Sequence, residues 1–189
     1  QTCVAPDYAF VHSSVLSSFL SLLKSVVQRF YGEDPSKSED YGRIIHEHHW
    51  DRLDDLLQQT ESSIVFGGER DRAQRYIAPT IVVLDDTNNP LMEDKLFGPI
   101  LPILPYDDIR EVVDYVDRHS RPLAAYVFTE RQDIANYVMT MMRFGGGCIN
   151  DTLTHVGNLH LPFGGVGTSG VGTYHGKATF DAFTHEKAI

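Results

Sequence analysis

The stretch Leu123-Ala124-Ala125-Tyr126-Val127-Phe128 is the clearest β-strand signal in the sequence, and a helix is predicted on each side of it. Before it, Asp107 or Asp108 can cap a helix whose apolar residues recur at helical spacing, namely Val112, Val113, Tyr115 and Val116. After it, Thr129 is expected to cap a second helix that continues to Met142. A strand between two helices is the repeating unit of a parallel sheet covered by helices.

The rest of the chain repeats this alternation. Amphipathic helices are predicted at 14–30 and 47–59, and short extended segments at 64–66, 76–84 and 100–104. Gly145-Gly146-Gly147 predicts a tight turn before a strand, and residues from Asp151 onward are rich in glycine and aromatics, as in a functional loop region. We therefore expect an α/β fold, a three-layer α/β/α arrangement with a mostly parallel sheet, in one domain over residues 1–189.

Composition narrows the classes of function. The 189 residues are 42% hydrophobic and carry a formal charge of −10, which argues against a nucleic-acid partner because phosphate binding needs a basic face. No apolar run approaches the roughly 18 residues of a membrane span. The two cysteines make no disulfide framework and favour a reducing compartment, so we expect a cytoplasmic location. No metal site is expected either, because Trp50 stands where the zinc-protease pattern begun by His46 and Glu47 needs its second histidine.

Cys3 is a candidate nucleophile. It lies in a short polar segment ahead of a predicted helix, and main-chain amides near a helix start can both lower a thiol pKa and hold an oxyanion. The alternative is a small buried cysteine with a packing role.

The glycine-rich segment near the end of the chain carries a second signal. Gly165, Gly167 and Gly170 fit the spacing of a dinucleotide fingerprint, but the strand, helix and acidic residue that such a site requires do not accompany them. Glycines do permit a close approach of backbone to a reactive centre, with Phe163 as the wall of an apolar passage; alternatively they only serve turns. Asn150 either binds a loop or ligand or is a turn-forming asparagine.

Six segments, read in order, resemble the aldehyde dehydrogenase superfamily. They are residues 1–8, 75–80, 96–103, 150–151, 161–167 and 174–177. The first and last of them, with Val4-Ala5-Pro6-Asp7-Tyr8 and Tyr174-His175-Gly176-Lys177, look most like the class 3 branch, which includes fatty aldehyde dehydrogenases.

The resemblance implies a chemistry and a set of site residues. Cys3 matches the nucleophile that attacks a small-molecule aldehyde, after which a hydride passes to NAD or NADP and water hydrolyses the thioester to a carboxylic acid. The residues implied for the substrate or oxyanion region are Asn150, Phe163, Gly164 and His175. Phe97 matches an aromatic near the nicotinamide, and Lys95 stands where the family usually has a glutamate that binds the nicotinamide ribose.

The resemblance also implies partners. The nucleotide-binding half of the family has no counterpart in residues 1–189, so we expect this chain to be the catalytic half of an enzyme. We expect the isolated chain to be inactive and the complete enzyme to be a homo-oligomer. Some class 3 relatives carry a carboxy-terminal membrane anchor, which would lie beyond Ile189. Two alternatives remain open: a non-catalytic binding or assembly module that keeps the fold, and cofactor-independent esterase activity at the thiol.

Overall fold

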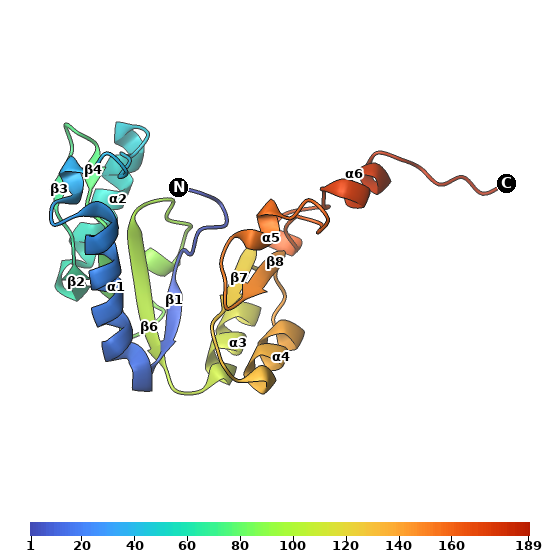
Figure 1. The fold of residues 1–189 in the computed structure, drawn as a ribbon, viewed down its shortest axis with the longest axis horizontal. Helices are drawn as coiled ribbons and strands as arrows, with labels where there is room; N and C mark the ends of the chain where they lie inside the picture. Colours follow the sequence, from blue (N-terminus) through green and yellow to red (C-terminus); the bar gives the residue numbers. More distant parts are fainter. The chain divides into compact units, whose positions relative to one another are not determined.

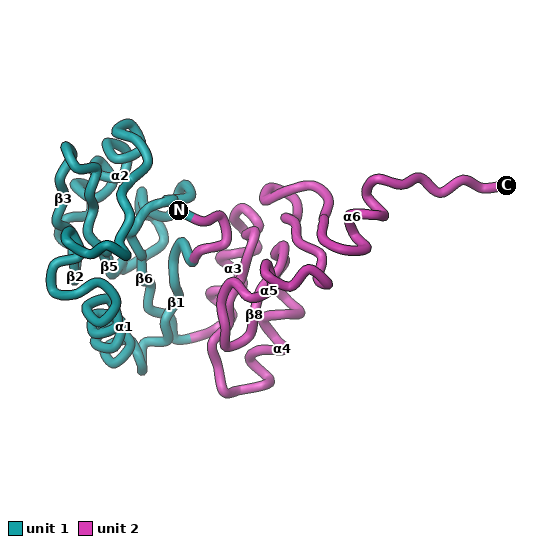
Figure 2. Tube along the Cα trace, turned by 45° about the horizontal axis from the view of Figure 1, so that its top comes forward, with its two compact units in different colours: residues 1, 6–107 teal, residues 2–5, 108–189 magenta.

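A computed structural model describes residues 1–189 and divides the chain into two compact units (Figure 2). The first unit consists of Gln1 with Pro6–Asp107, and the second of Thr2–Ala5 with Asp108–Ile189. The assignment of residues 1–189 to one catalytic domain stays a prediction.

The first unit is built on a four-stranded sheet (Figure 1). Its strands, in spatial order, are β1 (Ala9–His12), β6 (Ile100–Tyr106), β5 (Thr80–Val83) and β2 (Ile64–Phe66). The β1–β6 and β6–β5 pairs are parallel, and only β2 is antiparallel to its neighbour. A separate antiparallel pair is formed by β3 (Arg70–Asp71) and β4 (Tyr76–Ile77). The predicted mostly parallel α/β sheet is confirmed, although β1 was not foreseen.

One helix covers each face of this sheet. Helix α1 (Leu16–Tyr31) packs on the face that carries Val11, Ile81 and Ile103. Helix α2 (Glu47–Gln59) packs on the opposite face, where Leu53 and Leu57 are fully buried among the side chains of Val82, Ile100 and Leu104. Because neighbouring residues of a strand point to opposite faces, Ile81 and Val82 serve different layers. Within the first unit, the predicted three-layer arrangement is therefore confirmed.

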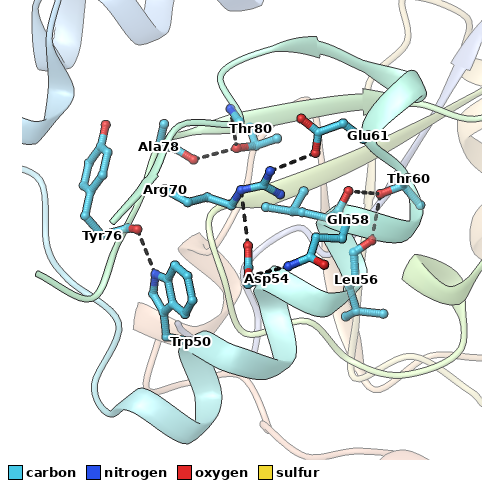
Figure 3. Close-up of polar contacts among 12 residues, drawn as sticks. Trp50, Asp54, Leu56, Gln58, Thr60, Glu61, Arg70, Tyr76, Ala78 and Thr80 are labelled. Carbon is cyan, nitrogen blue, oxygen red and sulfur yellow. Dashed lines mark hydrogen bonds and ion pairs between the residues drawn. The ribbon is translucent and has the colours of Figure 1, made fainter. Parts of the chain in front are cut away.

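A partly buried cation joins helix α2 to strand β3 (Figure 3). Arg70 Nε lies 3.2 Å from Asp54 Oδ1, and its Nη2 donates to Glu61 at 2.8 Å. Arg70 and Asp54 are each 19% exposed, whereas Glu61 is 61% exposed. Beside this cluster the Trp50 indole donates to the Tyr76 carbonyl at 2.8 Å. Together these bonds fix the hairpin against the helix.

The second unit holds two parallel strands, β7 (Ala124–Val127) and β8 (Gly146–Ile149). Its helices are α3 (Ile109–Arg118), α4 (Gln132–Met141), α5 (Thr154–Gly157) and α6 (Gly176–Ala182). Five short 3₁₀ turns complete the chain: Ser13–Val15, Pro35–Lys37, Glu61–Ser63, Pro90–Met92 and Gly167–Ser169. No helix of the chain combines the length and the apolar character that crossing a bilayer requires.

Two local predictions in this unit were wrong. Helix α4 begins at Gln132 with Arg131 as its N-cap, and Thr129 instead accepts a bond from the Arg131 amide. The glycine triplet makes no tight turn, because Gly146 and Gly147 belong to β8. A Cβ at Gly147 would lie 2.0 Å from the oxygen of Ala125, so glycine is what lets the two strands approach.

Candidate functional site

Cys3 lies in a turn of the second unit. The Ala5 amide donates to the Thr2 carbonyl at 3.1 Å, and Cys3 itself is exposed. The first regular element after this turn is strand β1, so the expected position at a helix start was wrong. The main-chain amides of the turn remain the candidate oxyanion donors next to the thiol.

A tyrosine from strand β7 fastens this turn. The Tyr126 hydroxyl donates to the Val4 carbonyl at 2.6 Å, and Val4 is only 3% exposed. Burial raises the pKa of Tyr126, and the charges of Cys148 and Cys3 raise it further, against a lowering contribution from the Leu153 backbone. The phenol is therefore a stable hydrogen-bond donor at neutral pH.

The second cysteine lies beside a buried histidine. Cys148 Sγ is 3.5 Å from His155 Nδ1 and 3.3 Å from Thr154 Oγ1. His155 is 8% exposed, its Nε2 has no hydrogen-bond partner, and burial lowers its pKa. A neutral imidazole is therefore expected at this position at pH 7. The His155 ring meets the Tyr126 ring edge-on, with centroids 5.8 Å apart.

Phe163 and His175, both predicted site residues, lie together. Their rings stack with centroids 5.9 Å apart, and the Phe163 ring centroid is 6.2 Å from that of His155. Main-chain bonds of 2.8 and 2.9 Å between Phe163 and Tyr174 hold this pair in place. Tyr126, His155, Phe163, Tyr174 and His175 thus form a continuous series of ring contacts in the second unit.

Gly164 and Asn150 have structural contacts that the sequence did not reveal. A Cβ at Gly164 would lie 2.2 Å from the Gly172 oxygen, so this glycine permits two backbone segments to meet. The Asn150 side chain accepts from the Thr129 amide at 2.8 Å and donates to the Thr129 carbonyl at 2.9 Å. Both bonds are those of a loop-fastening asparagine, and the oxyanion role predicted for Asn150 stays a prediction.

Phe97 and Lys95, the residues predicted to bind cofactor, lie in the first unit. The Phe97 side chain is 40% exposed, its backbone has a positive φ of 50°, and Lys95 Nζ lies 5.1 Å from the centroid of its ring. The segment is held by His49 Nε2, 2.9 Å from the Phe97 carbonyl, and by Asp7, which accepts from the Leu96 amide at 3.0 Å.

The chemistry of these side chains fits a nicotinamide nucleotide in part. An exposed aromatic ring offers a flat surface for a planar heterocycle. Lys95 provides donors only, so it can bind a phosphate oxygen but cannot accept from ribose hydroxyls. No group of three or more His, Cys, Asp or Glu side chains is arranged to hold a metal ion.

Three residues next to the predicted site were missed. Tyr126 was assigned to a strand without a role, and His155 and Cys148 were given none. Tyr126 contacts a residue 122 positions away, and no periodicity in one sequence reports such a pairing. His49 in helix α2 also reaches a predicted site residue, since its Nε2 lies 2.9 Å from the Phe97 carbonyl oxygen.

Known proteins match this chain over its whole length. Residues 1–189 match the family model described as the aldehyde dehydrogenase family. The chain is 46% identical over 188 residues to 4,4'-diaponeurosporen-aldehyde dehydrogenase of Staphylococcus aureus, covering 100% of this chain and 41% of that protein. It is 39% identical over 188 residues to the dimeric NADP-preferring aldehyde dehydrogenase of Rattus norvegicus, again covering 100% of this chain and 41% of the relative.

Solved structures agree with these matches. A structure described as the substrate-bound state of Staphylococcus aureus AldH superposes with a TM-score of 0.95 at 46% identity, over 99% of this chain and 41% of that one. An NAD-dependent aldehyde dehydrogenase from Sinorhizobium meliloti has a TM-score of 0.84 at 23% identity, over 96% of this chain and 37% of that one, and shows the shared fold. The chain therefore spans about 40% of the length of the relatives it matches.

Proposed function

This chain belongs to the aldehyde dehydrogenase family, and on that premise we propose that the protein oxidises aldehydes to carboxylic acids with Cys3 as the nucleophile. The observation that carries the proposal is the exposed Cys3 thiol in a turn fastened at the adjacent Val4 carbonyl. An exposed thiol can meet a carbonyl carbon, and a fastened turn limits the geometries in which it does so.

The proposed chemistry begins and ends on the Cys3 sulfur. The thiolate attacks the aldehyde carbon and forms a thiohemiacetal, whose oxygen charge the Cys3 amide can bind. Loss of a hydride converts this adduct to a thioester, and water then releases the acid and the thiolate. A bound NAD or NADP would supply the hydride acceptor, with Phe97 as the residue that would pack against it.

We propose an apolar, fatty type of aldehyde as the substrate. The staphylococcal relative is named for 4,4'-diaponeurosporen-aldehyde. In the second unit Leu159 and Leu161 are 65% and 45% exposed, in the same loop as Phe163, so an apolar chain would find apolar surface there. The stacked rings of Phe163 and His175, two residues predicted for the substrate or oxyanion region, would line the same region.

We also propose that a nucleotide-binding part of the protein completes the site and that the complete enzyme is a cytoplasmic homo-oligomer. Residues 1–189 align with only 41% of the length of each of the staphylococcal and rat relatives, which supports the proposal of a further, nucleotide-binding part. The rat relative is named as dimeric, which supports the oligomer. Light scattering of the purified natural protein tests the oligomer, and cell fractionation tests the location.

The activity is tested on the intact natural protein with dodecanal and either NAD or NADP, by the absorbance of the reduced nucleotide. Cys3→Ala should lower the rate by at least about a thousandfold, because the covalent path is removed. Cys148→Ala is the matched control, since it removes the other thiol, and it should retain the activity. Nucleotide-dependent oxidation that persists in Cys3→Ala would remove the assigned role, and ester hydrolysis without nucleotide would favour the esterase alternative.

A further inference from the structure

The hydrogen bond between Tyr126 and Val4 links the β7–β8 strand pair to the turn that carries Cys3. We propose that Tyr126 is a positioning residue for the Cys3 nucleophile, which it holds in place through the main-chain carbonyl of Val4. This inference rests on the proposed function for the role of Cys3, and its structural part can be measured without any activity.

The Tyr126 ring is itself firmly placed. Tyr126 is paired in register with Cys148 in the parallel β7–β8 ladder. On its edge lies the buried ring of His155, with centroids 5.8 Å apart. His155 in turn packs so closely on Gly146 that a Cβ there would lie 2.9 Å from the ring. A phenol fixed by a strand and a packed imidazole presents its hydroxyl in one direction.

The anchored carbonyl belongs to the residue that follows Cys3. Val4 is buried at 3% exposure, so its carbonyl has little access to water as an alternative partner. The other main-chain bond of the turn joins Ala5 to Thr2 across Cys3 and Val4. Removing the phenol hydroxyl would leave the Val4 oxygen without its donor and give the Cys3 peptide new freedom.

Nucleophilic attack is sensitive to that freedom. The sulfur must approach the carbonyl carbon while the developing oxyanion meets its donors, and small misplacements cost large factors in rate. Tyr126 does not need to touch substrate for this effect. Its removal should lower the rate of the chemical step and leave the binding of a nucleotide unchanged.

The test compares two matched variants of the intact natural protein. Tyr126→Phe keeps the ring and removes the hydroxyl that bonds to Val4. Tyr41→Phe removes the same kind of bond, a phenol donating to the Ile77 carbonyl at 2.7 Å, in the first unit. The readouts are hydrogen exchange of the peptide that contains Thr2–Ala5, kcat with dodecanal, KM for the nucleotide, and the thermal midpoint.

Tyr126→Phe should speed exchange in Thr2–Ala5 and lower kcat about tenfold with an unchanged KM for the nucleotide. Tyr41→Phe should shift the thermal midpoint by about as much as Tyr126→Phe does. It should leave the hydrogen exchange of Thr2–Ala5 and kcat within about twofold of their values in the natural protein, which separates positioning from a general loss of stability.

Unchanged exchange in Thr2–Ala5 would overturn the anchor, and faster exchange with an unchanged kcat would overturn its role in positioning. If the natural protein shows no aldehyde oxidation, the proposed function fails, and the exchange of Thr2–Ala5 alone still decides whether Tyr126 fixes the turn.

Discussion

Cys148 Sγ lies 3.5 Å from His155 Nδ1, which places the second thiol of the chain against a histidine whose other ring nitrogen is buried without a partner. Both residues contact Tyr126: Cys148 is its register partner in the β7–β8 ladder, and the His155 ring meets the Tyr126 ring edge-on. The protonation of His155 therefore bears on the support of the Cys3 turn.

Stability should depend on pH through His155. Burial lowers its pKa below the ordinary 6.5, so in the window below 6.5 the unfolded chain binds a proton that the native state does not. The contribution of neutral His155 to the free energy of unfolding is present above pH 6.5 and is lost as the pH falls toward the lowered pKa of the native state. The thermal midpoint of the natural protein should fall as the pH is lowered through that window, and it should fall less steeply in His155→Gln.

His160→Gln, at an exposed position of the same unit, is the control and should keep the pH dependence of the natural protein. An identical slope in all three proteins would contradict this account.

Gly147→Ala should destabilise the second unit by about 1–3 kcal/mol, because its Cβ would lie 2.0 Å from the Ala125 oxygen and the strands would have to part. Gly157→Ala is the matched control, since a Cβ there meets nothing within 4 Å. Urea unfolding followed by circular dichroism measures both. Equal midpoints for the two variants would show that the β7–β8 pair tolerates a side chain.

Asp54→Ala should lower the free energy of unfolding by about 2–3 kcal/mol, since it leaves the partly buried Arg70 guanidinium without its less exposed partner (Figure 3). Glu61→Ala removes the exposed partner of the same guanidinium and should cost less than about 1 kcal/mol. Denaturant titration of the two variants checks the order, and a larger loss in Glu61→Ala would contradict it.

Much of the fold could be predicted where periodicity is strong. Helix α2 was expected at the observed bounds, since its leucines recur on one face, and Asp108 was one of two predicted caps for α3 and accepts from the Arg110 amide. Strand β1 is four residues long and directly precedes a helical turn, so no alternation marks it. Strand β8 contains two glycines, which ordinarily argue against a strand; the nearness of the Ala125 oxygen explains Gly147, and the packed ring of His155 explains Gly146.

The candidate site was only partly predictable. The resemblance pointed to Cys3, Phe163 and His175, and the structure brings the last two into contact. It could not show that Tyr126 reaches Val4, because the bond depends on how β7 and the Cys3 turn meet in space. Nor could the sequence show that the Asn150 amide is occupied by Thr129.

The most direct test of the central claim is to trap the acyl intermediate on the intact natural protein. The protein is mixed with dodecanal and nucleotide, quenched in acid during turnover, digested and mapped by mass spectrometry. We predict an acyl group on the peptide that contains Cys3, at the same level in Cys148→Ala. An acyl group on Cys148, or continued oxidation with no adduct in Cys3→Ala, would contradict the assignment of Cys3 as the nucleophile.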